Sequence, residues 1–221
     1  MLLRLACALG LAAIPGFADT VLYQGTFAAD DDEVQFTIDV SATELVTIES
    51  WGYAGGTVPT SPSPTAIAAG GFAPNAILFD PSGNEIVSDA GGHCGITNTD
   101  PVTGNCDDSY IQETLGPGSY TLALVEYDNE PNDSFLGDGF VQDGNPGFTC
   151  AEFGQTGNFC DVTTALGTAR DGNYAVSVTA ADIVATPEPA AISLFCLGSC
   201  FFAALLFRRR GWNGTMQERD R

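Results

Sequence analysis

Short strand-like runs separated by turn residues dominate residues 19–185, and they restrict the fold more than any other feature of the sequence. Runs of β-branched and aromatic residues alternate with Gly, Pro, Asn and Asp, and no run of ten or more residues has the period of a helix. Within residues 33–40, apolar side chains alternate with polar ones, as Val34, Phe36, Ile38 and Val40. Such alternation gives a strand one dry face and one wet face, which two packed antiparallel sheets satisfy.

The sequence therefore predicts an all-β domain, an antiparallel β-sandwich with a jelly-roll-like arrangement of about seven or eight strands. The clearest predicted strands cover residues 21–27, 33–40, 45–51, 76–80, 110–115, 120–127 and 174–179. Residues 80–84 join two strands as a hairpin would, and Gly116-Pro117-Gly118 predicts a tight turn.

Two stretches of the domain lack strand patterning and are predicted to be loops. Residues 55–71 contain Pro59, Pro62 and Pro64, which exclude a central strand. Residues 129–169 are rich in Gly and show little alternation. Because long loops on a rigid sandwich commonly carry binding groups, we expect the functional surface in this second insertion.

The charge of the chain excludes a nucleic-acid binder. Its 221 residues include 28 Asp and Glu but only 7 Lys and Arg, giving a formal net charge of −21. All seven cations are Arg, and only Arg170 lies between residues 19 and 189, where 26 acidic residues give a formal charge of −25. No basic patch for phosphate groups can form on such a domain.

Both ends of the chain have the pattern of targeting signals. Residues 1–18 combine Arg4, an apolar run and the small residues Gly16 and Ala18 before Asp19, as in a secretory signal peptide. Residues 190–207 are uncharged and long enough for one C-terminal transmembrane helix. An Arg cluster follows directly, so the positive-inside rule predicts an inner-membrane precursor whose acidic domain faces the periplasm.

The residues around the predicted helix resemble a known sorting signal. Pro187, Glu188 and Pro189 precede the helix, and Arg208, Arg209 and Arg210 follow it. This ordered set resembles the PEP-CTERM signal of Gram-negative bacteria that make exopolysaccharide. The resemblance implies recognition by an exosortase, an integral-membrane cysteine protease that removes the helix and frees the domain for the cell surface or extracellular matrix.

This interpretation divides the chain into four parts: a signal peptide (1–18), an exported β-sandwich domain (19–185), a sorting signal (186–210) and a cytoplasmic tail (211–221). The tail departs from the family pattern, since such signals usually end within a few residues of the Arg cluster. A retained membrane anchor is the alternative.

The exported domain itself has a second resemblance. Residues 115–124 resemble the penultimate strands of the bacterial pre-peptidase C-terminal domain, a small secreted sandwich. Residues 127–129 and 138–149 are similar to a group of PEP-CTERM proteins that have a related sandwich and no assigned molecular function. The resemblance thus implies a fold and gives no activity.

Four cysteines belong to the exported domain, and an oxidising compartment predicts that they form two disulfides. Three pairings of Cys94, Cys106, Cys150 and Cys160 are possible. We favour Cys94 with Cys106 and Cys150 with Cys160, because each closes a short loop within one insertion. A zinc site is disfavoured because the chain has no C-x-x-C motif and His93 is its only histidine.

The acidic loops are the candidate metal site. Carboxylate and amide oxygens in Gly-rich loops are typical Ca²⁺ ligands, and the residues we select are Asp128, Asp138, Asp143 and Asn145. The interpretation we favour is a solvated acidic surface that keeps an exported protein soluble, with the calcium site as the alternative, and this interpretation applies equally to the run Asp30-Asp31-Asp32-Glu33.

Nothing in the sequence predicts catalysis. A hydrolytic triad would depend on His93, and no G-x-S-x-G motif is present. Trp51, Tyr53, Phe140 and Phe148 are interpreted as core anchors, with a sugar-stacking platform as the alternative.

The sequence thus predicts a non-enzymatic protein of the cell surface or exopolysaccharide matrix with a structural or adhesive role. Its predicted partners are an exosortase and an exopolysaccharide. A calcium-dependent carbohydrate-binding module is the alternative function.

Overall fold

The computed structural model describes residues 19–181 and 183–187 of the chain. The chain divides into two units, Met1–Ala185 and Thr186–Arg221. Within the described residues, no helix is both long enough and apolar enough to cross a membrane. The predicted signal peptide, the predicted transmembrane helix, Glu188, Pro189 and the Arg cluster all lie outside these residues.

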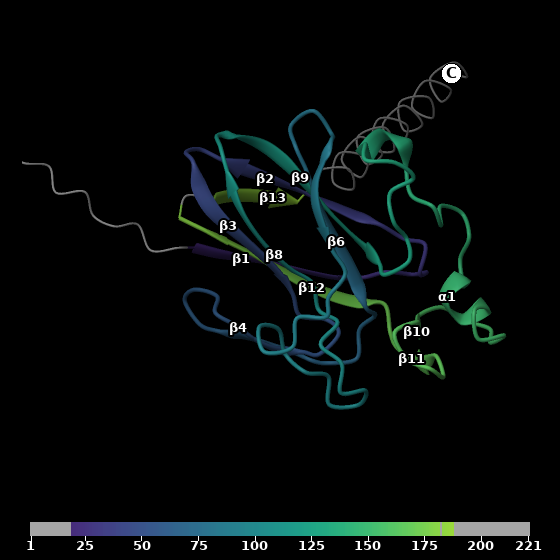
Figure 1. Cartoon of the computed structure of the whole chain (residues 1–221). Coiled ribbons are helices and arrows are strands. Elements are labelled where there is room, and N and C mark those ends of the chain that lie inside the picture. Colours follow the sequence, from purple (N-terminus) through teal and green to yellow (C-terminus); the bar gives the residue numbers. More distant parts are fainter. Residues whose placement is uncertain (1–18, 182, 188–221) are drawn as a thin grey trace, which may run out of the picture. The chain divides into compact units, whose positions relative to one another are not determined.

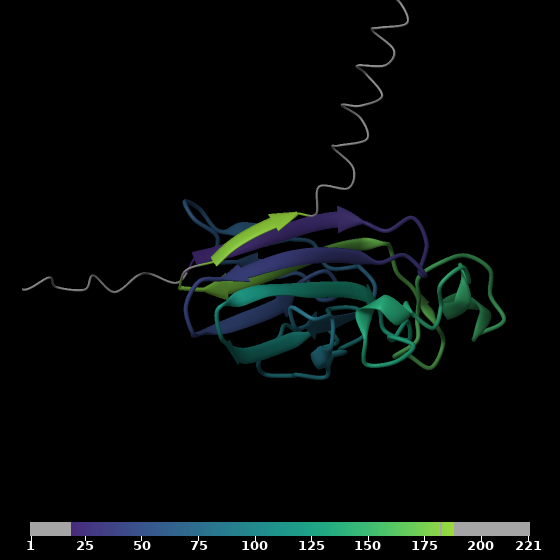
Figure 2. The ribbon, with the colours of Figure 1, turned by 90° about the horizontal axis from the view of Figure 1, so that it is seen from above.

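Two antiparallel sheets form the domain (Figures 1 and 2). The four-stranded sheet has the order β1 (Asp19–Thr26), β12 (Asn173–Ala180), β3 (Glu44–Ser50) and β8 (Tyr110–Leu115). The five-stranded sheet has the order β13 (Ile183–Pro187), β2 (Val34–Val40), β9 (Gly118–Glu126), β6 (Pro74–Phe79) and β7 (Glu85–Asp89). The prediction of an all-β fold with antiparallel sheets is confirmed.

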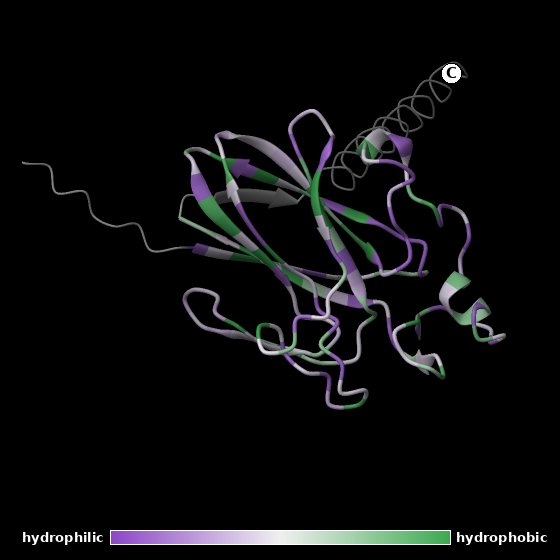
Figure 3. Ribbon diagram, viewed as in Figure 1, coloured by the Kyte–Doolittle hydropathy of each residue, from purple (hydrophilic) through white to green (hydrophobic). Residues whose placement is uncertain are grey.

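The hydrophobic core lies between the two sheets and receives side chains from both. Phe36, Ile38 and Leu122 contribute from the five-stranded sheet, and Ile48 and Val178 contribute from the four-stranded sheet. Figure 3 shows the corresponding apolar stretches along the strands. A slip of one residue in register would turn each inward set toward solvent, so this core fixes the strand pairings.

The outer face of the five-stranded sheet is also covered. Ala123 and Val125 of β9 point away from the main core, yet both are buried beneath Phe140 and Leu136 of the long insertion. This second layer explains why every residue of β6 is buried, with no polar alternation. It also holds the insertion against the sheet.

The two predicted loops contain short elements of their own. Residues 55–71 include a hairpin of β4 (Gly56–Val58) and β5 (Thr65–Ile67), which corrects the prediction of a loop there, although neither strand joins a main sheet. The 129–169 insertion contains η1 (Leu136–Asp138), α1 (Phe148–Ala151), β10 (Cys160–Asp161) and β11 (Thr168–Ala169). Figures 1 and 2 place α1 and β10 at the end of the sandwich opposite the start of β1.

Turn chemistry positions two further connections. The Asp80 carboxylate accepts hydrogen bonds from the backbone N–H groups of Ser82 and Asn84, at 2.8 and 2.9 Å, and this closes the predicted hairpin between β6 and β7. The predicted turn at Gly116-Pro117-Gly118 is different, because β8 and β9 belong to opposite sheets. That turn carries the chain across the core.

Candidate functional site

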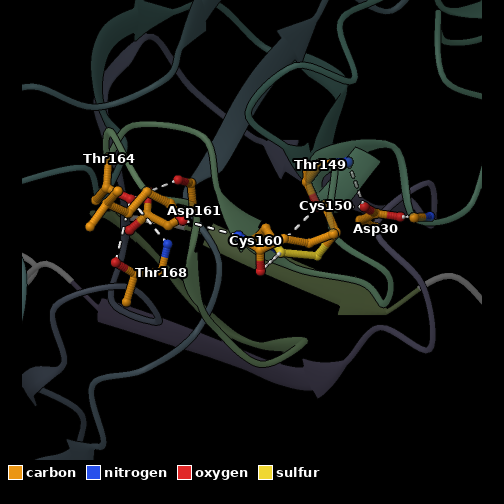
Figure 4. Close-up of a disulfide and its surroundings, with 10 residues drawn as sticks. Asp30, Thr149, Cys150, Cys160, Asp161, Thr164 and Thr168 are labelled. Carbon is orange, nitrogen blue, oxygen red and sulfur yellow. Dashed lines mark hydrogen bonds between the residues drawn. A yellow bond between two sulfur atoms is a disulfide. The ribbon is translucent and has the colours of Figure 1, made fainter. Parts of the chain in front are cut away.

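Two disulfides secure the loops of the domain, and both predicted pairings are confirmed. Cys94 is bonded to Cys106 and Cys150 to Cys160, with sequence separations of 12 and 10 residues. The second disulfide ties α1 to β10 (Figure 4). Because all four sulfur atoms are in disulfides, these cysteines do not provide thiolate ligands for a zinc ion.

Asp30 holds the Cys150–Cys160 loop onto the sandwich. Its carboxylate is fully buried and accepts hydrogen bonds from the backbone N–H of Gly147, at 2.5 Å, and from the Thr149 hydroxyl, at 2.6 Å. The Thr149 backbone N–H donates a third, at 2.9 Å (Figure 4). The interpretation of residues 30–33 as solvated surface is therefore wrong for Asp30, which replaces water with donors from residues more than 100 positions away.

Arg170 organises a second buried network between the 90–108 loop, the 161–164 turn and the sandwich. Its side chain is only 3% exposed, and its guanidinium lies 3.2 Å from the Asp100 carboxylate, which has no exposed surface. Two other guanidinium nitrogens donate to backbone carbonyls, those of Gly71 and Tyr53, at 2.8 and 2.7 Å. Burial raises the pKa of Asp100, but hydrogen bonds from Thr103 and the charge of Arg170 outweigh burial and leave that pKa lowered.

The same network fixes Tyr53 and Asp161. The Tyr53 hydroxyl donates to the Asp161 carboxylate at 2.8 Å, and the Arg170 guanidinium lies over the Tyr53 ring. A neighbouring carboxylate, Asp108, accepts from the Ser50 hydroxyl at 2.8 Å and from the Ala54 backbone N–H at 2.9 Å. Burial raises the pKa of Asp108 despite these donors. Asp108 and Asp161 have structural roles, because their carboxylates accept hydrogen bonds from groups of the protein itself.

Glu126 is the exception among the buried acids. It ends β9, has no exposed surface, and neither carboxylate oxygen has a hydrogen-bond partner among the described residues. Burial raises its pKa well above the ordinary value, and the carboxylates of Asp128, Asp30 and Asp161 raise it further. The Asp128 backbone N–H lies near the carboxylate without forming a hydrogen bond of good geometry, and it lowers the pKa only in part. A fully buried carboxylate without partners needs either a proton or a bound cation.

The predicted calcium ligands lie between the end of β9 and the middle of the insertion. Asp128 faces Glu152 and Glu130, and its pKa is raised by burial and by these two carboxylates. The Asp143 carboxylate accepts from the Phe140 backbone N–H at 3.0 Å, Asn145 donates to Gln142 at 2.8 Å, and Asp138 belongs to η1. Across residues 19–181 and 183–187, no three His, Cys, Asp or Glu side chains form a group able to hold a metal ion. Calcium binding stays a prediction.

Three of the four aromatic residues singled out from the sequence are buried, and Trp51 is half-buried. Tyr53, Phe140 and Phe148 are buried, and Trp51 donates from Nε1 to the Ser177 hydroxyl at 2.9 Å. Burial of three of the four confirms the interpretation as anchors and excludes a platform made from all of them. His93 contacts Asp89, with Nε2 2.6 Å from the carboxylate.

A hollow on the outer side of the four-stranded sheet was not predicted from the sequence. It has a volume of about 220 Å³ and lies between the ends of β1 and β12 and the segment after β5. Its lining includes the polar residues Gln24, Asp171 and Asn173 and the small residues Gly52, Ala68 and Ala69. Its polar residues belong to strand ends and to the turn before β12, which the sequence pattern marks only as strand boundaries.

No family model matches the chain, and no curated protein is similar to it.

Proposed function

We propose that this protein is exported, passes through the inner membrane as a precursor sorted by an exosortase, and has a structural or adhesive role at the cell surface or in an exopolysaccharide matrix. The observation that carries the proposal is the pair of disulfides, Cys94–Cys106 and Cys150–Cys160. Disulfides of this kind persist in oxidising compartments outside the cytoplasm. They accord with the signal peptide and the Pro187-Glu188-Pro189 signal expected from the sequence.

The arrangement of the strands supports a jelly-roll-like sandwich related to the pre-peptidase C-terminal domain. Consecutive strands β1, β2 and β3 alternate between the two sheets, and β12 returns to lie between β1 and β3. The pairings thus join strands that are distant in sequence, as in two interleaved Greek keys.

A non-enzymatic role agrees with the use of the buried polar groups. Asp30, Asp100, Asp108 and Asp161 each accept hydrogen bonds that hold loops to the sandwich. A catalytic carboxylate must face a substrate, whereas these face backbone and side-chain donors of the protein itself.

The experiment is to locate the mature protein and measure its intact mass. Cells producing the full-length chain are separated into membrane, medium and matrix fractions. We expect a mature chain that begins near Asp19 and ends near Pro189 in the medium or matrix. The matched control is a Glu188→Ala variant, which should accumulate in the membrane fraction at full length apart from the signal peptide. Recovery of the Arg208–Arg210 peptide from the matrix fraction would contradict the sorting proposal.

The second candidate function is a calcium-dependent carbohydrate-binding module. The observation that favours it is Glu126, a fully buried carboxylate without a hydrogen-bond partner among the described residues, whose ionised form the charges of Asp128, Asp30 and Asp161 disfavour. A divalent cation would satisfy such a group and would order the adjoining insertion. Binding of matrix glycans in the presence of Ca²⁺, and its loss in EDTA, is the measurement that separates this function from a purely structural role.

A further inference from the structure

The hollow beside β1 and β12 presents polar groups that the protein leaves unused. Asp171 accepts the Asn173 backbone N–H at 2.9 Å through one carboxylate oxygen, and the other oxygen has no hydrogen bond within the described residues. Asn173 accepts the Thr26 hydroxyl at 2.7 Å, which orients its amide and leaves its NH₂ group unpaired among the described residues. The Gln24 side chain is exposed and likewise has no partner in this part of the chain. The lining of the hollow therefore contains both free acceptors and free donors.

The walls of the hollow are held in place before any ligand arrives. The Asp171 backbone N–H donates to Gly70 at 2.9 Å, and the Gly71 N–H donates to Gly52 at 2.9 Å. A side chain at Gly71 would place its Cβ 2.2 Å from the Asn173 carbonyl oxygen, so this close backbone approach requires glycine. The Arg170 side chain also holds this wall in place by donating a hydrogen bond to the Gly71 carbonyl oxygen. Such preformed walls reduce the entropy lost when a ligand binds.

The charge around the hollow selects against anions. Asp171 is the charged side chain in its lining, and no described cation faces it. Arg170, the single cation of the described residues, is engaged with Asp100, Gly71 and Tyr53. Phosphate, sulfate and uronate groups would thus meet a carboxylate with no compensating charge. A neutral ligand rich in hydroxyl groups fits this chemistry.

The size and the pattern of polar groups narrow the ligand to one sugar ring. The volume of about 220 Å³ is below the range of roughly 300–1,000 Å³ for drug-sized ligands. A carboxylate oxygen and an amide NH₂ two residues apart can accept from one hydroxyl and donate to the next on a ring. Ile67, Ala68 and Ala69 supply an apolar wall for the C–H face of such a ring.

We propose that the hollow formed by Gln24, Asp171, Asn173 and residues 67–71 binds one neutral hexose unit of a polysaccharide through adjacent hydroxyl groups. The biological role of this site rests on the proposed matrix function, because a sugar site would give an adhesive protein its ligand. The binding itself depends only on the folded domain.

The test uses the full-length chain purified in an amine-oxide detergent, because maltoside and glucoside detergents would occupy a sugar site. Ligand-observed saturation-transfer NMR is recorded with methyl glucoside, methyl galactoside and methyl mannoside, and with glucuronate as the anionic counterpart. We expect saturation transfer to at least one neutral glycoside, and at least tenfold weaker transfer to glucuronate. Competition by dextran or galactomannan then measures the affinity for polymer.

Three variants locate the binding. Asp171→Asn removes the acceptor charge, and Ala68→Phe fills the hollow from an exposed position, so each should weaken binding at least tenfold. Ala66→Phe is the matched control, since Ala66 is exposed on β5 outside the lining and should bind as the parent does. Equal near-ultraviolet circular dichroism of the four proteins shows that each is folded.

Two results would overturn the proposal: no saturation transfer to any neutral glycoside, or unchanged binding by both Asp171→Asn and Ala68→Phe. Either result combined with a processed protein in the matrix would leave the proposed function standing and refute this site alone. Sugar binding by a protein that is never exported would support this site and contradict the proposed function.

Discussion

The guanidinium of Arg170 lies over the aromatic ring of Tyr53, with its Cζ 3.9 Å from the ring centroid. The same ring donates its hydroxyl hydrogen to Asp161, while Arg170 also pairs with Asp100. One cation and one tyrosine thereby join the 90–108 loop, the 161–164 turn and the end of β3. Asp100 lies within the loop closed by Cys94–Cys106 and Asp161 follows Cys160, so the network contacts both disulfide-bonded loops.

Arg170→Met should destabilise the domain by about 3–5 kcal/mol, because it leaves Asp100 buried without its positive partner. Denaturant unfolding followed by tryptophan fluorescence measures the loss. Arg170→Lys keeps the charge but loses the planar contact with Tyr53, so its stability should fall between those of the parent and the Met variant.

Adding Asp100→Asn to the Met variant provides the control for this mechanism. Removal of the unpaired charge should restore part of the stability. If Arg170→Met lowers the unfolding free energy by less than about 1 kcal/mol, the Arg170–Asp100 pair contributes no more than an exposed ion pair, and the network does not stabilise the domain.

Glu126→Gln should stabilise the domain at pH 8 in EDTA. Because the folded state raises the pKa of Glu126, the folded protein retains a proton that the unfolded chain releases above about pH 4.3. Stability is therefore lost as the pH rises above that value, at about 1.4 kcal/mol for each unit by which the folded pKa exceeds the unfolded one. Gln mimics the protonated acid and should remove this loss.

Unfolding free energies of parent and variant at pH 5 and pH 8 are the measurement for Glu126. Glu130→Gln is the matched control, since it makes the same substitution at an exposed side chain nearby in sequence. A Gln variant less stable than the parent at pH 8 would show that the carboxylate is ionised and compensated.

Replacement of Cys150 and Cys160 by serine should cost about 2–3 kcal/mol, because the disulfide restricts a short loop in the unfolded chain. Hydrogen exchange should increase first in residues 147–160, where Thr149 and Gly147 donate to Asp30. The Cys94→Ser and Cys106→Ser pair is the control and should affect residues 94–106 instead. Thiol titration of the exported form under denaturant should find no free thiol, and two or more would contradict the oxidised state.

Calcium should raise the melting temperature beyond the effect of ionic strength. For an extracellular site with a Kd of about 1 mM, about 10 mM Ca²⁺ adds about 1.4 kcal/mol. We expect Asp138→Ala and Asp143→Ala to remove the excess and Asp31→Ala to retain it. Asp143 also accepts a hydrogen bond from the Phe140 N–H, so its substitution lowers stability by itself. The melting temperature of each variant in Ca²⁺ is therefore compared with that of the same variant in Na⁺ at matched ionic strength. Equal shifts with the two salts would show that no calcium site exists.

The sequence by itself determined seven of the nine strands of the two main sheets and favoured the correct disulfide pairing. Alternation along residues 33–40 reflects a local property, the period of two in a strand, and the structure places Phe36 and Ile38 in the core accordingly. The cysteine pairs are close in sequence, so short loop closure predicted both bonds. Leu122 and Leu124 of β9 face the core, and the same alternation places Glu126 on the inward face. The sequence pattern did not predict this, because an acidic side chain is ordinarily assigned to the solvent-exposed face.

Only the tertiary structure decided which acids are buried and where the hollow lies. Asp30 receives its donors from residues 117 and 119 positions away, and Arg170 meets Asp100 across 70 positions. Whether a carboxylate is solvated or enclosed depends on these distant contacts, because its desolvation is offset only by donors that folding brings to it. The sequence pattern places an acid on the chain, while the packing of the loops on the two sheets sets its surroundings.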